Sequence, residues 1–296
     1  MNDSQLAVLC TLIYADIFNY PLKSSEIYQR IISDKKISQK EVLLVLAGLF
    51  KKGKVGRDHG YYFLPGREKL VGKRNKSEAR AKEKVGLARK AISLISKVPF
   101  VSMIGLSGSL AFDTAKPNDD IDLVVISLPN SLWIARGLVY LLLKTLGGPF
   151  LGLKLRAPGS KQTENRLCLN VFIDGSDLEI KEARRTLFTA YQILFLRPLA
   201  DKNKTFSYFC RQNNWMGKFL ANKFINKKAT ERYGQEKTNG CILLINRILY
   251  LLQLSYMKGK PKAEAGLTQA FFHPQSKAEE TLATYRNKCR DLSISP

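Results

Sequence analysis

Residues 101–127 hold the pattern that most constrains how this chain can fold. Within them, one strand-like run leads into Gly108 and Ser109, and after ten intervening residues a second run opens with Asp120 and Asp122. Residues two apart on a strand point to the same side of the sheet. The pattern therefore predicts two strands joined through a glycine turn, with both aspartate side chains projecting together from the start of the second, mostly buried strand.

This arrangement of residues indicates a site for a metal ion and a phosphate. Two neighbouring carboxylates repel each other unless a cation lies between them, and hard oxygen ligands suit Mg²⁺ or Mn²⁺. Gly108 lets backbone N–H groups approach a phosphate closely, and Ser109 adds a hydroxyl donor. A helix starting just after this turn would direct its positive end at the same anion. A metal held by Asp120 and Asp122 beside a phosphate cradle is the minimal apparatus for nucleotidyl transfer.

The same stretch resembles a known superfamily. Gly-Ser, followed after ten residues by Asp-Ile-Asp, is similar to the nucleotidyltransferases that include DNA polymerase β, poly(A) polymerases and the aminoglycoside nucleotidyltransferases. The specific resemblance covers about 27 residues. The sequence GSLA…PNDDIDLVV most resembles those of small bacterial and archaeal nucleotidyltransferase-domain proteins. An N-terminal winged helix together with a late Phe272-His273-Pro274 is similar to an uncharacterised prokaryotic group of that kind. The resemblance implies an α+β fold with a mixed sheet flanked by helices.

Carried onto this chain, the resemblance implies roles for individual residues. Gly108 and Ser109 would hold the triphosphate, and Asp120 and Asp122 would ligate the metal. The superfamily completes its site with a third carboxylate on a later strand, and here the matching run, 166–173, offers Asn170 instead. An amide can coordinate a metal through its oxygen, but it cannot act as a base. The departure puts catalysis in question and leaves the fold prediction unchanged.

Several other polar residues near these runs are candidates of lower rank. Asp174, Asp177 and Glu179 follow the third strand closely, and Asp113 stands where the superfamily often has glycine. We expect Asp119 to cap or position the turn rather than bind metal. The chain has only two histidines, His59 and His273, and we expect both to be structural. Lys154 and Arg156 could meet a phosphate or an acidic substrate, and a solvated face explains them equally well.

The whole chain is expected to form three units. Helical periodicity, an S-x-x-E cap at Ser38 and a short hairpin predict three helices and then two strands over residues 1–66, the order of a winged helix-turn-helix. Residues 67–200 are predicted to be the nucleotidyltransferase domain, opening with a basic linker helix over 67–97. Residues 201–296 are predicted to be a helical C-terminal region, with amphipathic pieces near 206–226, 239–257 and 275–291.

Charge bears on the partners of this protein. The chain has 48 Lys+Arg against 25 Asp+Glu, a net charge of +23, which favours binding to polyanions. Residues 51–90 hold fourteen basic and four acidic residues, a local excess of +10. This run is either a solvated face that links two domains or a surface for nucleic acid next to the winged helix. Many winged helices serve protein contacts or dimerisation instead, so a homodimer is a further alternative.

Cysteine usage and hydropathy indicate a cytoplasmic protein without a membrane span. The five cysteines are scattered and contain no CxxC pair, and the first ten residues do not resemble a secretory signal. Two apolar stretches, 132–155 and 241–256, fall short of about 20 uninterrupted apolar residues. The first contains Arg136, Lys144 and a Gly-Gly-Pro turn, and the second is short and contains Arg247.

The predicted function is an enzyme, a Mg²⁺-dependent nucleotidyltransferase. It would transfer a nucleoside monophosphate from a nucleoside triphosphate, with ATP as the expected nucleotide, to a hydroxyl of an acceptor that the sequence does not identify. RNA, tRNA, a protein side chain and a small hydroxylated molecule all fit. The alternative is a DNA-binding regulator or toxin–antitoxin-type module whose degenerate transferase domain senses nucleotide without turnover, and Asn170 supports it. A protein-interaction scaffold is a third alternative.

Overall fold

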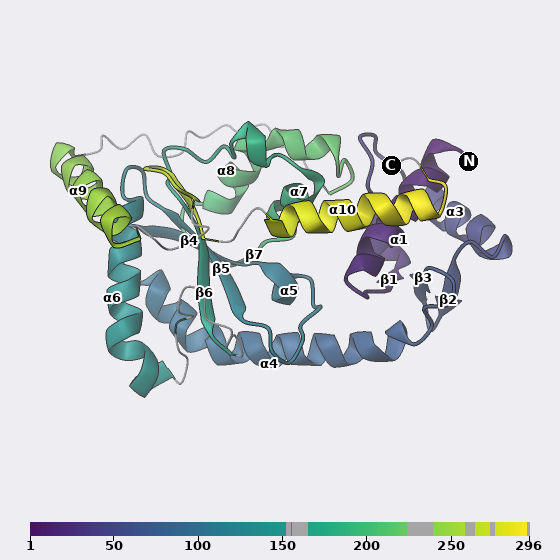
Figure 1. The fold of residues 1–296 in the computed structure, drawn as a ribbon, viewed down its shortest axis with the longest axis horizontal. Coiled ribbons are helices and arrows are strands. Elements are labelled where there is room, and N and C mark those ends of the chain that lie inside the picture. Colours follow the sequence, from purple (N-terminus) through teal and green to yellow (C-terminus); the bar gives the residue numbers. More distant parts are fainter. Residues whose placement is uncertain (152–154, 156–164, 224–238, 258–263, 273–275, 295–296) are drawn as a thin grey trace.

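The computed structural model describes residues 1–151, 155, 165–223, 239–257, 264–272 and 276–294. Within these ranges the chain is an α+β protein with ten α-helices, a six-stranded mixed sheet and a small three-stranded antiparallel sheet near the N-terminus. Figure 1 shows the small sheet at one end of the molecule and the large sheet toward the other, with the long helix α4 (Leu70–Ser96) running between them along one side.

The N-terminal residues form the elements that their periodicity predicts. The helices are α1 (Asp3–Ile17), α2 (Ser24–Arg30) and α3 (Gln39–Lys51), followed by the hairpin strands β2 (Gly56–Asp58) and β3 (Tyr61–Phe63). The predicted cap at Ser38 is present, because its hydroxyl accepts a hydrogen bond from the backbone N–H of Glu41 at 3.2 Å. A third strand, β1 (Leu22–Lys23), pairs with β3; its two residues are too few to leave a pattern in the sequence.

The large sheet has the strand order β7-β4-β5-β6-β9-β8. Its central strands are β4 (Val101–Leu106), β5 (Ile121–Ser127) and β6 (Leu167–Ile173), at the three places where the sequence predicts strands. Strands β5 and β6 are parallel, and the remaining pairs in the sheet are antiparallel. The connection between β5 and β6 contains helix α6 (Leu132–Leu151).

Two short strands correct the prediction that residues 201–296 form a helical region, and a third further strand lies just before them. Strand β7 (Arg197–Asp201) forms one edge of the sheet, and β8 (Glu264–Ala265) and β9 (Gln269–Phe271) form the other. Pro198 lies in β7, where an edge strand tolerates the missing N–H. The C-terminal region is therefore not all helical. Strands of two or three residues are too short to show the two-residue alternation by which a strand is recognised.

Helices cover both faces of the large sheet. On one face, α4 and α6 pack over the side chains of Ile121, Leu123 and Val125. On the other face, Val124 and Ile126 join a hydrophobic cluster that continues through α7 (Leu187–Leu194) and α8 (Thr205–Gln212) into the three N-terminal helices. The last helix, α10 (Ser276–Asp291), crosses α1 in Figure 1, and the rings of Tyr14 and Tyr285 meet edge to face at 5.6 Å. This shared core brings the N-terminal helices close to strand β5, which contains Asp122.

Candidate active site

Gly108 and Asp122 meet where β4 ends and β5 begins. The backbone N–H of Ser107 donates to the carbonyl oxygen of Asp122 at 2.9 Å, which fixes the turn against the second strand. Gly108 has φ +64°, and a Cβ on it would collide with Oδ2 of Asp122. Both the left-handed backbone and the lack of space require glycine at this position. The predicted glycine turn and the predicted aspartate are therefore direct neighbours.

The structure brings Asp120 and Asp122 together as the strand alternation predicts. The Asp122 side chain lies on the same face of β5 as Val124, opposite Ile121 and Leu123, which pack into the other core. One ligand atom each from Asp120, Asp122 and Cys168 lies within 4.8 Å of the others. Asp122 is only 6% exposed, so its carboxylate is held in a largely desolvated position. Two close carboxylates with this burial favour a cation between them.

Asn170 completes this cluster because strand β6 is irregular. The register of β6 against β5 shifts between Leu123 and Val124, so Asn170 is passed over in the pairing. Asn170 and Val171 both face the site, whereas Leu169 faces the opposite core. An irregularity of this kind re-aims a side chain. The amide of Asn170 donates to Oδ1 of Asp122, and its own Oδ1 accepts from Cys168 Sγ at 2.6 Å.

The donor set fits a hard divalent cation held by the two aspartates. Mg²⁺ and Mn²⁺ take carboxylate oxygens, whereas a thiol prefers softer metals. Cys168 also donates its hydrogen to Asn170, so the oxygen donors of Asp120 and Asp122 are the groups suited to Mg²⁺. The close fit of Gly108 against Asp122 keeps this carboxylate in place. Asp120 and Asp122 are the residues that would hold Mg²⁺ here.

The loop before the aspartates is held by polar contacts from two sides. Asp119 accepts a hydrogen bond from the backbone N–H of Lys116 at 2.9 Å, as its predicted role in the turn requires. From α4, the buried Lys84 donates to the carbonyl oxygens of Pro117 at 2.8 Å and Asp119 at 2.5 Å. Asp113 has φ +58° and is paired with Arg197.

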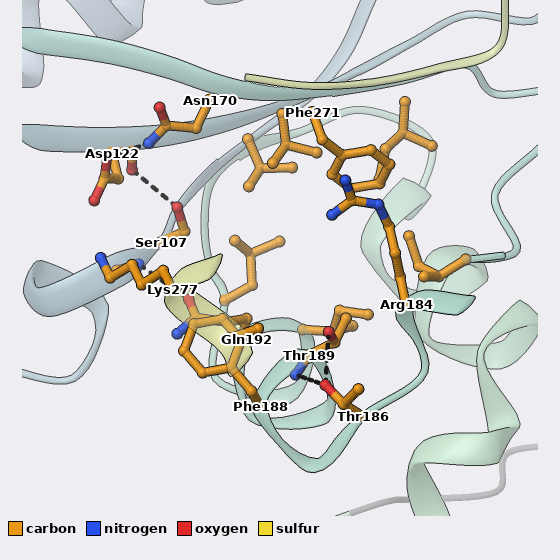
Figure 2. Close-up of a pocket in the computed structure, with 18 of the residues that line it drawn as sticks. Ser107, Asp122, Asn170, Arg184, Thr186, Phe188, Thr189, Gln192, Phe271 and Lys277 are labelled. Atoms are coloured by element: carbon orange, nitrogen blue, oxygen red, sulfur yellow. Dashed lines mark hydrogen bonds between the residues drawn. The ribbon is translucent and has the colours of Figure 1, made fainter. Parts of the chain in front are cut away.

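Two cavities meet at Gly108 and Asp122. The first, here called the Asp120 cavity, has a volume of about 290 Å³ and is lined by Ser109, Thr114, Lys116, Asp119, Asp120 and aromatic side chains of α1 and α7. The second, here called the Phe271 cavity, has a volume of about 300 Å³ and is lined mainly by apolar residues of β5, β6, α7 and β9, with Arg184 at one end. Figure 2 shows the second cavity, with Asp122 and Asn170 at the end opposite Arg184.

Five residues line both cavities: Gly108, Asp122, Phe188, Gln192 and Lys277. The side-chain oxygen of Gln192, on α7, accepts a hydrogen bond from the backbone N–H of Gly108 at 3.3 Å. Lys277 lies in the first turn of α10, and Figure 2 shows its side chain beside Ser107 and Asp122. Neither residue is among those that the sequence predicts for the site. A glutamine on an apolar helix and a lysine in a basic chain leave no signal of their own.

The predicted phosphate cradle is present only in part. Gly108 and Ser109 both line the Asp120 cavity. The helix that begins there, α5 (Gly108–Ala111), has only four residues, so the expected support from a helix dipole is not available. The Gly108 N–H is already paired with Gln192, and a phosphate would have to displace that amide oxygen. Lys116, on the same cavity wall, adds a positive charge that the sequence analysis did not single out.

The other carboxylates near the third strand have structural partners. Asp174 is fully buried and accepts hydrogen bonds from the backbone N–H groups of Asn130, Ser131 and Leu132 at 2.6, 2.9 and 3.0 Å, so it caps the start of α6. Asp177 accepts from Thr268, and Glu179 pairs with Arg185. His59 is exposed in the hairpin turn and pairs with Asp58. His273, Lys154 and Arg156 lie outside the described residues.

The basic run over 51–90 divides into buried and exposed parts. Four of its fourteen cations make internal contacts: Arg67 pairs with Asp16, Arg74 with Glu26 and Glu78, Arg80 donates to Ala115, and Lys84 holds the acidic loop. The other ten are exposed: Lys51, Lys52, Lys54, Arg57, Lys69, Lys73, Lys76, Lys82, Arg89 and Lys90. The four contacting cations stabilise the fold. The ten exposed cations are available either as a solvated face or as a surface for nucleic acid.

None of the helices in the described ranges is both long enough and apolar enough to cross a bilayer. This agrees with the prediction that the apolar stretches around 132–155 and 241–256 are not membrane spans. Comparison of the chain with protein-family models, with curated proteins and with solved structures finds no match.

Proposed function

We propose that this protein is a Mg²⁺-dependent nucleotidyltransferase with a nucleotidyltransferase-type fold behind an N-terminal winged helix. The observation that carries the proposal is the meeting of Asp120 and Asp122 against the Gly108 turn, where the ligand atoms of the two carboxylates lie within 4.8 Å. Two carboxylates beside a close backbone turn are suited to a divalent cation and a phosphate.

The Asp120 cavity is the better place for the nucleoside triphosphate. Ser109, Thr114 and Lys116 offer hydroxyl and ammonium donors to phosphate oxygens beside Asp120. The opposite wall is aromatic, with Tyr14, Phe18, Tyr20, Phe112 and Tyr191 along the cavity, and such rings suit a nucleobase. A bound Mg²⁺ would neutralise phosphate charge and polarise the α-phosphorus. The chain itself would position the triphosphate through Ser109, Thr114 and Lys116.

Calorimetry with ATP and Mg²⁺ tests this proposal. We expect wild-type protein to bind ATP only with Mg²⁺, and we expect Asp122→Asn and Asp120→Asn to weaken binding at least tenfold. Glu83→Gln removes one negative charge from the exposed side of α4 and serves as the matched control, with unchanged binding. Equal binding by the Asp122 variant and the wild type would contradict the assigned site.

A second candidate function is favoured by Asn170. Since an amide lies in the position of the third carboxylate and donates to Asp122, the site lacks a group there that could accept a proton. A module that binds nucleotide without turnover and reports it to DNA fits this arrangement. The ten exposed cations between residues 51 and 90 would supply the phosphate contacts.

Turnover separates the two candidates. Protein, Mg²⁺, ATP labelled at the α-phosphate and cell extract are incubated together, and transfer of label to any macromolecule or metabolite favours the enzyme. If no label moves while ATP binds, DNA binding is measured with and without ATP across a salt series. We expect Lys51→Glu and Lys54→Glu to reduce the salt dependence if the sensing module is correct.

A further inference from the structure

The Phe271 cavity differs in chemistry from the Asp120 cavity although the two meet at Asp122. Its walls are largely apolar and include Val124, Ile173, Ile193 and Phe271. A volume of about 300 Å³ is at the lower end of the range for pockets that enclose small organic molecules. Ser109, Lys116 and Asp120 line only the other cavity, so a ligand in the Phe271 cavity does not meet these three groups.

Polar groups lie at both ends of the Phe271 cavity, and Glu279 of α10 also lines it. At one end lie Asp122 and Asn170, both buried, with Lys277 beside them (Figure 2). At the other end the guanidinium of Arg184 lies over the ring of Phe271, with 4.0 Å between its Cζ and the ring centroid.

The guanidinium of Arg184 keeps donor capacity for a ligand. The Arg184 side chain is 15% exposed. Its Nε–H donates a hydrogen bond to Oε2 of Glu264 at 3.1 Å, and its Nη2 lies 2.5 Å from the same oxygen. A guanidinium carries five N–H donors, so Glu264 alone does not use them all. Glu264 compensates the charge of Arg184, so the remaining N–H groups of the guanidinium act on a ligand anion as hydrogen-bond donors.

We propose that this cavity binds the acceptor of the transfer reaction, and that the acceptor is a small amphipathic molecule rather than a nucleic acid or a protein. Its apolar body would fill the space between β6 and α7, its hydroxyl would lie beside Asp122, and its carboxylate-type anionic group would pair with Arg184. This inference rests on the proposed function. The acceptor oxygen bonds to the α-phosphorus of the nucleotide, the bond to the β-phosphate bridging oxygen breaks, pyrophosphate leaves, and the hydroxyl proton passes to water.

Binding of a probe tests the cavity independently of turnover. The probe is ω-hydroxydecanoate, titrated into the full chain by calorimetry. The comparison compound is the diol of the same chain length, which lacks the carboxylate. We expect wild-type protein to bind the hydroxy acid at least tenfold more tightly than the diol. Arg184→Gln should remove this preference, and Arg184→Lys should keep part of it. Equal affinities for the two compounds in the wild type would overturn the role of Arg184.

Filling the cavity tests the location. Thr189 lines this cavity and not the other, and both its backbone N–H and its hydroxyl lie 3.2 Å from the Thr186 hydroxyl that caps α7. Thr189→Trp keeps the backbone bond of this cap, so it should block the probe and leave the fold intact. Val171→Phe is a second filler from β6. Leu251→Ser removes an apolar side chain that is 63% exposed on α9 (Gly240–Met257) and should change nothing. Probe binding that survives both fillers would place the probe elsewhere and overturn the inference.

ATP binding by the same variants distinguishes the two proposals. We expect Mg²⁺-dependent ATP binding to persist in both fillers, because the groups for the triphosphate lie in the other cavity. Loss of ATP binding in the fillers would mean that the nucleotide occupies the Phe271 cavity, and would overturn the acceptor assignment. If the wild type binds the probe but not ATP, the proposed function fails while the cavity remains a site for amphipathic anions.

The labelled product identifies the acceptor class. After incubation with α-labelled ATP, Mg²⁺ and cell extract, we expect the transferred label in small molecules that extract into butanol and carry negative charge. Thr189→Trp should reduce this label at least tenfold. Label recovered instead in acid-precipitated nucleic acid or protein would overturn the inference while leaving nucleotidyl transfer in place.

Discussion

The side-chain amide of Asn170 donates a hydrogen bond to Oδ1 of Asp122, and both residues are almost fully buried. The amide N–H stabilises the charge of the Asp122 carboxylate, whereas a carboxylate in its place would repel it. Replacing the Asn170 amide by a carboxylate therefore tests whether the cluster around Asp122 needs a cation to balance added negative charge.

Asn170→Asp should create a site that depends on metal. Without Mg²⁺, repulsion between neighbouring carboxylates should lower the free energy of unfolding by about 1–3 kcal/mol. With Mg²⁺ the loss should disappear, and metal affinity should rise about tenfold because ligand charge tightens cation binding. Denaturant unfolding at several Mg²⁺ concentrations measures both effects. Asn170→Ala is the control, and a similar Mg²⁺ response in that variant would contradict the explanation.

Gly108→Ala should damage the site through sterics. The added Cβ meets Oδ2 of Asp122, and the left-handed φ is unfavourable for alanine, so we expect a loss of about 1–3 kcal/mol in stability. Mg²⁺-ATP binding should fall at least tenfold, because the carboxylate must move. Gly86→Ala on the exposed side of α4, with no atom within 4 Å of its Cβ, should instead stabilise the chain by about 0.5–1 kcal/mol. Thermal unfolding and calorimetry measure the two variants side by side.

Lys84→Met should loosen the loop that carries Asp119 and Asp120. The Lys84 side chain is buried, and removing its ammonium leaves the carbonyl oxygens of Pro117 and Asp119 without this donor. We expect a loss of about 1–3 kcal/mol in stability, together with weaker Mg²⁺ binding. Lys82→Met, at an exposed position on the same helix, should leave both unchanged. Weaker metal binding in the Lys82 variant as well would indicate a general charge effect instead.

The ion pair between Glu26 and Arg74 should make stability depend on acidity. Burial opposes the charged form of Glu26, but hydrogen bonds from Arg74 and from the Lys23 backbone outweigh it, and the pKa of Glu26 lies below its ordinary value of 4.5. A carboxyl with a lowered pKa contributes stability above its ordinary pKa and loses it as the pH falls through the folded-state pKa.

Glu26→Gln should therefore be less stable by about 3 kcal/mol at neutral pH, because it leaves Arg74 buried without this carboxylate. The gap between variant and wild type should narrow as the pH falls below 4.5. Urea unfolding across this pH range measures the gap, with Glu83→Gln as the exposed control. A constant gap at all pH values would show that the charge of Glu26 is not the cause.

The sequence alone predicted the three central strands, the glycine turn and the aspartate pair. These features depend on local rules, because the two-residue period of a strand places Asp120 and Asp122 together and the turn between the strands requires a residue such as Gly108. Capping at Ser38 and the turn role of Asp119 follow from the same short-range chemistry. Such features can be predicted from the sequence because each depends on residues only a few positions apart.

Only the tertiary structure decided what surrounds the pair. The irregularity in β6 aims Asn170 at Asp122, α4 contributes Lys84, α7 contributes Gln192, and α10 returns from the far end of the chain with Lys277. These contacts join residues far apart in sequence, and they depend on how the helices pack against both faces of the sheet. The periodicity of a short sequence segment predicts its own secondary structure. It does not predict which side chains from distant segments will contact it.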